Sequence, residues 1–311
     1  MSFCDHAKKF NDQYVSDFSM EKGIENPEIT YRIRTDWDSE IDAYKAFEQF
    51  LNDPKLPQIK NFIIGLWELE AFEVAPTRMV EMIVANKEKL QHIKGIFFGD
   101  ITYEENEISW ISNTDHSVIL DALPNLEIYQ VRGGNDLSLG SLNHPNLKKL
   151  IIETGGMDSK ILKEIAGANL PNLTHLELWL GSSYYGFDSS AEEVAATFRG
   201  KNPNHLPALK YLGLRNCEVA DELAKLLIGH PIMDRIEVLD LSKGTISDAG
   251  AEALVNNPKV QSLKKLNLDH SYITDKWAAK LKKLTKVGVQ VSLDEREPDE
   301  AEEDRYVCVG E

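Results

Sequence analysis

The sequence predicts an α/β protein in which short strands and helices alternate and each strand lies parallel to the next in one curved sheet. Three observations predict this fold class. An apolar frame, with apolar residues at its first, fourth and sixth positions, recurs eight times. Helix-like segments separate most of the frames. The last three frames begin at Leu209, Ile236 and Leu263, so the spacing between them is 27 residues twice over, which indicates a repeat architecture.

The earlier frames keep the same pattern at irregular spacing. We expect a strand in each frame, because side chains that alternate in direction place positions 4 and 6 on one face. Only 21 residues separate the third frame from the fourth, so we expect a loop at 133–144 in place of a full helix. All eight frames begin at residues 59, 93, 126, 147, 173, 209, 236 and 263.

The segments between the frames have the caps and periodicity of helices. Residues 245–258 offer Ser247 or Asp248 as an N-cap. Strand and helix repeated in this order make the strands parallel, and stacking the units buries a continuous core. The sequence therefore predicts a solenoid with strands on its concave side and helices on its convex side. Further helices are expected at 77–90, 115–123, 158–167, 189–200 and 219–229.

The N-terminal end is expected to cap the solenoid, since a stack of repeats needs a covered first face. Residues 27–38 alternate as a strand. Residues 39–53 carry an apolar stripe at helical spacing, with Ser39 and Asp42 placed to cap the helix. This strand and helix have the order of one degenerate repeat. We assign 1–55 to an N-terminal cap.

The C-terminal end changes character after the last frame. We assign 56–293 to the repeat domain, with 286–293 as its last strand. Residues 294–311 carry nine acidic residues and two arginines, which predicts a solvated, disordered acidic tail. The β-prone residues 306–309 leave one alternative open, in which this part of the tail docks as an edge strand or serves as a short linear motif.

The frame L-x-x-L-x-L and the stretch LDLSKGTISDAGAEAL (239–254) resemble leucine-rich-repeat proteins, closest to the ribonuclease-inhibitor-like class. In that class a strand is followed by a turn and a helix with a D-x-G-x-x-x-L element, which Asp248, Gly250 and Leu254 match here. The resemblance covers 59–293 and implies the solenoid fold, with little said about function. The family's Asn or Cys, five residues after the second leucine, is matched only by Cys217. Several repeats place glycine there, which predicts positive φ or close backbone approach.

Composition bears on partners and compartment. The chain has 51 acidic and 34 basic residues, a net charge of −17, and such a surface repels nucleic acid and anionic membranes. Three scattered cysteines argue against a disulfide framework. The first residues lack the apolar region of a signal peptide, and no apolar run is long enough to span a membrane. We therefore expect a soluble, cytoplasmic monomer that binds neither nucleic acid nor membrane.

Motifs that carry chemistry are missing from the sequence. It contains no nucleophile elbow, phosphate-binding loop, H-E-x-x-H or Cys-x-x-Cys. Cys4 and His6 flank Asp5, but two ligands are fewer than a closed zinc site needs. We predict no catalytic residue, no metal and no cofactor. One alternative is an enzyme or enzyme subunit with its site in the irregular loops 99–116 and 181–190; another is a structural role through edge-to-edge assembly.

The concave face carries the most informative pattern. Positions 3, 5 and 7 of each frame point outward, and they are apolar in the early repeats and polar or acidic in the late ones. Exposed apolar patches mark interaction sites, so we predict a surface that binds a partner protein or peptide. Its predicted apolar and aromatic anchors are Ile63, Phe97, Ile151, Trp179 and Tyr211, and its predicted polar residues, which steer basic groups, are Asp240, Asn267 and Asp269.

Two alternatives to an open concave face remain. Residues 1–26 or the 306–309 segment fold back and cover the apolar patch. A slip of one residue in the early frames would bury every side chain taken as exposed.

Overall fold

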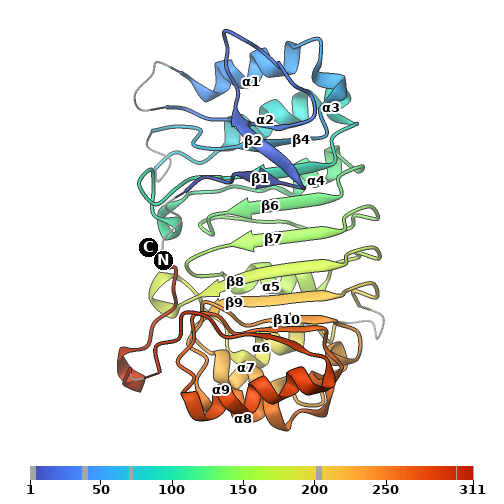
Figure 1. The fold of residues 1–311 in the computed structure, drawn as a ribbon. Helices are drawn as coiled ribbons and strands as arrows, with labels where there is room; N and C mark the ends of the chain where they lie inside the picture. The colour runs from blue at the N-terminus through green and yellow to red at the C-terminus, as the bar shows by residue number, and fades with distance from the viewer. Residues whose placement is uncertain (1–4, 37–40, 70–72, 201–204, 299, 311) are drawn as a thin grey trace. The chain divides into compact units, whose positions relative to one another are not determined.

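The computed structural model describes residues 5–36, 41–69, 73–200, 205–298 and 300–310 (Figure 1). The chain divides into two compact units, and the division falls at the end of strand β7. The first unit runs to Ile152 and the second begins at Glu153. Each is an α/β stack in which strands alternate with helices. No helix of the described residues is long and apolar enough to cross a membrane.

In the first unit the strands follow the order of the chain. β1 (Lys9–Phe10) pairs antiparallel with β2 (Gln13–Asp17), and the pairs from β2 to β6 are parallel. Tyr31, Phe62, Ile96 and Tyr129 are aligned across neighbouring strands. The early frames are therefore in the predicted register, with no slip. The remaining strands are β3 (Thr30–Ile33), β4 (Asn61–Ile64), β5 (Gly95–Phe98), β6 (Ile128–Arg132) and β7 (Lys149–Glu153).

Helix α1 (Ala43–Asn52) shows how the first unit builds its core. Asp42 is its N-cap, and the carboxylate accepts hydrogen bonds from the backbone N–H groups of Tyr44 and Lys45. Phe47 is fully buried and its ring lies 5.7 Å from that of Phe62 on β4. β3 and α1 lie within the predicted strand 27–38 and helix 39–53, but the N-cap of the helix is Asp42. Ser39 lies outside the described residues. The other helices are α2 (Thr77–Ala85), α3 (Lys87–Leu90) and α4 (Ser117–Ala122), with 3₁₀ turns at Leu56–Gln58 and Ile108–Trp110.

The second unit is more regular. Its parallel strands place Leu176, Leu212, Leu239 and Leu266, at the fourth frame position, in register with one another and with Val291 on the last strand. The first four of these side chains are fully buried, as the repeat predicts. The strands are β8 (His175–Gly181), β9 (Tyr211–Cys217), β10 (Val238–Asp240), β11 (Lys265–Asn267) and β12 (Gln290–Ser292).

The helices of the second unit are joined by side chains at their starts. Asp221 accepts hydrogen bonds from the backbone N–H groups of Ser247 and Gly250, both at 2.8 Å, and Asp248 accepts one from Thr274 at 2.8 Å. A Cβ on Gly250 would lie 2.5 Å from the Asp221 carboxylate. The glycine of the D-x-G element is therefore needed for close approach. The helices are α5 (Ser159–Ala166), α6 (Ala191–Thr197), α7 (Ala220–Leu226), α8 (Asp248–Asn256) and α9 (Asp275–Leu281).

A left-handed residue lies near the end of β9 and shortly after each of β10 and β11. Asn216, Lys243 and His270 have φ of 52°, 68° and 53°, although none is a glycine. The backbone N–H of each donates to a carbonyl of the next repeat, at 2.8 to 2.9 Å. Among the predicted glycines, Gly181 has positive φ, and Gly244 is required because a Cβ there would lie 2.6 Å from the Cys217 carbonyl oxygen. Backbone bonds thus link the turns where the family's Asn is missing.

Candidate partner-binding surface

We call the sheet face that carries frame positions 3, 5 and 7 the strand face. In the first unit this face is covered by the N-terminal segment, which we define as residues 5–17. Ile63 and Phe97 are 0% and 1% exposed, and the ring of Phe10 stacks on that of Phe97 at 6.2 Å. Ala7 packs against the same cluster. The two predicted anchors are therefore not open, because the chain's own N-terminal segment occupies their surface.

The N-terminal segment is anchored by a buried carboxylate. Asp100 is fully buried and accepts hydrogen bonds from the Ala7 backbone N–H, at 3.1 and 3.2 Å to its two oxygens. Arg32 donates to the same carboxylate at 2.9 Å, and the Arg132 guanidinium lies 3.8 Å away. A carboxylate shared between two guanidiniums and a backbone N–H keeps its charge satisfied inside the protein. The anchor thus joins Asp100 to three separate parts of the chain, at Ala7, Arg32 and Arg132.

A second ion-pair group lies beside this anchor. Arg34 donates to the Glu105 carboxylate at 2.8 Å, and His6 Nε2 lies 3.4 Å from the same side chain. Burial alone would raise the pKa of Glu105, but bonds from His6 and the Thr102 backbone N–H, with the Arg34 charge, lower it. His6 also contacts the Asp100 carbonyl oxygen at 3.1 Å. The N-terminal segment is therefore held by charge as well as by apolar packing.

Two further predicted anchors are buried. Ile151 on β7 is 9% exposed and Trp179 on β8 is 3% exposed. The Trp179 indole N–H donates to Glu177 at 2.8 Å, and the Arg215 guanidinium lies 4.8 Å from the ring centroid. A Lys243 ammonium lies 5.6 Å from the same ring. The prediction of an exposed Trp179 is wrong, because two cations cover its ring.

Tyr211, in contrast, is half-buried at the centre of a polar network. Its hydroxyl lies 3.1 Å from a Glu177 oxygen and 2.9 Å from an Asp240 oxygen, and its one proton can serve one carboxylate at a time. The imidazole of His175 stacks on the Tyr211 ring at 3.8 Å, within 5° of parallel. Burial, followed by the charges of Glu177 and Asp240, raises the pKa of Tyr211. The hydroxyl therefore stays protonated.

Arg215 balances the two carboxylates. It donates to Glu177 at 2.6 Å and to the Ser242 hydroxyl at 3.0 Å, and its Nε lies 3.7 Å from Asp240. Burial would raise the pKa of Glu177, but the bond from His175, the Arg215 charge and the Trp179 N–H together lower it to about 2. Glu177 is therefore ionised at all ordinary pH values.

The network continues onto the last strands. Asn267 donates to Asp240 at 2.9 Å, and its own side-chain oxygen accepts from the Asp269 backbone N–H at 3.2 Å. The Asp269 carboxylate accepts from Ser292 at 2.7 Å. We call this chain of contacts from β8 to β12 the polar network. It consists of His175, Glu177, Tyr211, Arg215, Asp240, Asn267 and Asp269.

The polar network gathers four of the eight predicted site residues and adds three. Tyr211, Asp240, Asn267 and Asp269 belong to it, whereas Ile63 and Phe97 lie under the N-terminal segment. His175, Glu177 and Arg215 were not predicted as site residues. Their frame positions, 3, 5 and 7, already placed them on the strand face, so the signal was present in the repeat itself.

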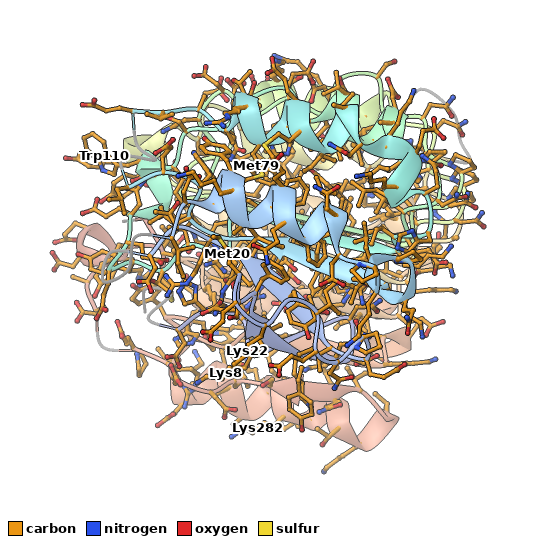
Figure 2. The ribbon with its side chains drawn as sticks, turned by 90° about the horizontal axis from the view of Figure 1, so that it is seen from above. Lys8, Met20, Lys22, Met79, Trp110 and Lys282 are labelled. Atoms are coloured by element: carbon orange, nitrogen blue, oxygen red, sulfur yellow. The ribbon has the colours of Figure 1, made fainter. Side chains whose placement is uncertain are left out.

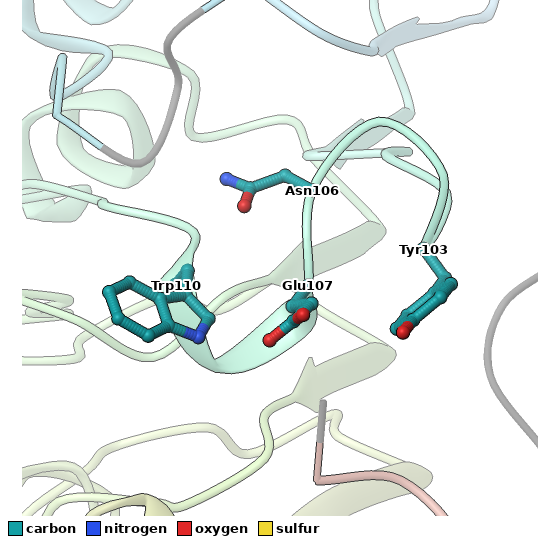
Figure 3. A pocket seen from close by; sticks show the side chains of 4 residues that line it. All are labelled: Tyr103, Asn106, Glu107 and Trp110. Atoms are coloured by element: carbon teal, nitrogen blue, oxygen red, sulfur yellow. The ribbon is translucent and has the colours of Figure 1, made fainter.

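The loop around 99–116 forms a shallow pocket of about 310 Å³ (Figure 3). Tyr103, Asn106, Glu107 and Trp110 line it, and Trp110 is 57% exposed, projecting from the ribbon (Figure 2). One carboxylate and no histidine are among these lining residues. The pocket thus lacks the converging acid and base groups that an enzyme site in this loop would require. No group of His, Cys, Asp and Glu suited to a metal ion occurs among the described residues, and Cys4 lies outside them.

Comparisons with known proteins agree with the fold. Neither a family model nor a curated protein matches the chain. A crystal structure of a Bacteroides fragilis protein is 32% identical, covers 86% of this chain and 74% of its own, and superposes with a TM-score of 0.78. Two further structures are more distant. A Listeria monocytogenes internalin is 12% identical, covers 88% of this chain and 62% of its own, and has a TM-score of 0.41. A Leptospira interrogans leucine-rich-repeat protein is 15% identical, covers 89% of this chain and 57% of its own, and has a TM-score of 0.39. The repeats of the chain, with their L-x-x-L-x-L frames in register, have the leucine-rich-repeat fold, and the chain belongs to the family of the Bacteroides fragilis protein.

Proposed function

We propose that this chain is a non-catalytic scaffold for protein–protein interaction, whose partner protein or peptide binds the strand face of the second unit. The observation that carries the proposal is the half-exposed polar network across β8 to β12. His175 and Arg215 side chains keep 21% and 18% of their surface exposed, and Asn267 and Asp269 are also partly exposed. Donors and acceptors held in place by their neighbours are what a specific polar interface needs.

The chemistry of the network defines the partner. The network holds three carboxylates, from Glu177, Asp240 and Asp269, and one guanidinium, from Arg215. The Lys243 ammonium lies beside it, over the Trp179 ring. The whole chain carries a net charge of −17. A partner that presents a basic side chain among polar groups is complementary to this surface, and the opposite charge speeds its approach. Trp179 supports the network from below rather than contacting the partner.

Site-specific photo-crosslinking tests the proposal. A photoreactive amino acid at Val238 or Lys265 lies at frame position 3, half-exposed on the strand face beside the network. The matched control is the same amino acid at Glu252, exposed on α8. We expect both strand-face positions to crosslink to one partner in cells and the helix position not to do so. Asn267→Ala should then weaken binding of the purified partner at least tenfold. Crosslinks to that partner from Glu252 alone would refute the proposed surface.

A further inference from the structure

The C-terminal segment, which we define as residues 306–310, packs against the second unit instead of extending into solvent. Val307 and Val309 are 7% and 2% exposed. Tyr306, which lies between the acidic stretch and Val307, is 66% exposed. Burial that alternates with a period of two is the pattern of an extended chain with one face against a surface. The predicted disorder of the acidic tail is wrong for this segment.

Three consecutive repeats each supply one residue that binds the segment's backbone. The Tyr272 hydroxyl donates to the Tyr306 carbonyl at 3.0 Å and accepts from the Tyr306 N–H at 3.1 Å. The Cys308 N–H donates to the Lys243 carbonyl at 2.9 Å. Followed from Tyr306 to Val309, the segment contacts Tyr272, then Lys243 and then Asn216, which is the reverse of the order of the repeats. The segment thus crosses the ends of the strands and does not add to the sheet as an edge strand.

Asn216 provides the most specific contact. It is fully buried and left-handed, and its side chain binds both backbone groups of one residue: Oδ1 accepts from the Val309 N–H at 2.9 Å, and Nδ2 donates to the Val309 carbonyl. A carboxamide paired with one residue's N–H and C=O imitates the hydrogen bonding of a neighbouring strand. Without the segment, the Asn216 side chain would keep only a 3.5 Å contact, from its Nδ2 to the Thr154 carbonyl.

The groove narrows beside the last residue of the segment. A Cβ on Gly310 would lie 2.3 to 3.2 Å from atoms of the Tyr185 ring, so only glycine fits against that ring. Tyr184 packs edge-on to Tyr185 at 4.9 Å and is itself 87% exposed. At the other end, the Arg305 guanidinium lies 5.7 Å from the Tyr272 ring centroid. Backbone contacts, two valine positions and a glycine position together define a pattern.

We propose that the row formed by Tyr185, Asn216, Lys243 and Tyr272 is a peptide-binding groove, and that the C-terminal segment is its tethered ligand. The groove recognises an extended peptide of the pattern Val-x-Val-Gly. Contacts through side chains and turn carbonyls form independently of the sheet, so the groove persists when the segment leaves. Residues 298–304 tether the segment and keep its local concentration high. This groove is separate from the strand face of the polar network, and its occupant differs from the partner proposed there.

Peptide binding in trans tests the groove. The chain lacking 305–311 is titrated with a fluorescent peptide of sequence RYVCVGE, and binding is measured by anisotropy. We expect saturable binding, at least tenfold weaker for the same peptide with Val309→Asp. Asn216→Gly in the protein keeps the left-handed backbone and removes the carboxamide, so it should also weaken binding at least tenfold. The shortened chain folded but unable to bind the peptide would overturn the proposal.

A second experiment covers the case in which the shortened chain does not fold. Residues 300–304 are replaced by a protease recognition site in the full chain, which is cut after folding. We expect the released segment to exchange with an excess of labelled RYVCVGE peptide, as followed by size-exclusion chromatography. No exchange within a day, with the cut chain still folded, would show that the segment is a permanent structural element and would refute the groove.

Discussion

The strand face of the first unit is apolar and covered, whereas that of the second unit is polar and partly exposed. In the first unit, frame position 5 carries Ile63 and Phe97, and the N-terminal segment covers them. In the second unit the same position carries Glu177, Asp240 and Asn267, which satisfy one another. Glu177 and Asp240 are buried in this network, while His175, Arg215 and Asn267 stay partly exposed. The comparison shows that one repeat frame can support either a covered apolar face or an open polar one, according to the residues at a single position.

Removing the anchor of the N-terminal segment should have the largest effect on the comparison. Asp100→Ala leaves the buried Arg32 and the nearby Arg132 without their shared carboxylate and releases Ala7. We expect a loss of about 3–5 kcal/mol in the free energy of unfolding, measured in urea. Glu104→Ala, an exposed acid in the same loop, is the control and should cost less than about 0.5 kcal/mol. Equal effects of the two would show that the anchor is unimportant.

Acid should weaken the first unit through the buried His116. Burial lowers the pKa of His116 to about 3, with Asp115 opposing it only in part. An unfolded histidine titrates near pH 6.5, so the unfolded chain takes up a proton that the folded one refuses. The free energy of unfolding should fall as pH drops below 6.5, by about 3 kcal/mol at pH 4.5. His116→Asn should remove this slope in urea titrations; a slope unchanged by the substitution would contradict the assignment.

Removal of a single side chain should expose the covered apolar face of the first unit. Phe10→Ala removes the ring stacked on Phe97 and exposes the cluster around Ile63. We expect a loss of about 3 kcal/mol in urea and new binding of the dye ANS to the apolar face. Tyr14→Ala, 67% exposed on β2, is the matched aromatic control and should bind no dye. Dye binding by both variants alike would point to general loosening instead.

Glu177 should make its own contribution to the acid response of the second unit only at low pH. The pKa of Glu177 is about 2 in the folded chain, against about 4.3 for an unfolded glutamate. Its contribution is fully present above about pH 5 and is lost as pH falls toward 2, by about 2–3 kcal/mol. Glu177→Gln should flatten the stability curve in that window alone. Flattening between pH 5 and 7 would mean that another group is responsible.

Removing the Tyr211 hydroxyl should show how much it contributes to the free energy of unfolding. Tyr211→Phe keeps the ring stacked on His175 but removes the hydroxyl that lies between Glu177 and Asp240. We expect a loss of about 1.5 kcal/mol, since hydrogen bonds to charged groups are worth somewhat more than neutral ones. Thermal melts at pH 7 measure it. A more stable variant would show that the hydroxyl is held at a cost to the fold.

Much of the fold could be predicted because the repeat specifies it locally. Leu212, Leu239 and Leu266 are in register at the spacing read from the sequence, and Phe62 and Ile96 keep that register in the irregular half. The helix cap at Ser247 also follows from its immediate neighbours. Such features depend on residues a few positions apart or on one constant period.

The open and covered surfaces could not be decided from the same pattern. Whether Phe97 faces solvent depends on Phe10, and whether Val309 is ordered depends on Asn216. Neither pair shares a repeat, and an apolar outward position reads the same with or without a cover. The sequence left both alternatives open, and the contacts of the two terminal segments resolve them.

The two terminal segments also constrain the order in which the protein folds. The contact between Ala7 and Asp100 closes a loop of 93 residues, and that between Asn216 and Val309 closes another of 93. Loops of this length are slow to close, whereas each repeat forms from neighbours in sequence. We therefore expect both segments to dock onto repeats that are already assembled. The stack of repeats would then form first and serve as a template. The two terminal segments would dock last during folding and detach first during unfolding.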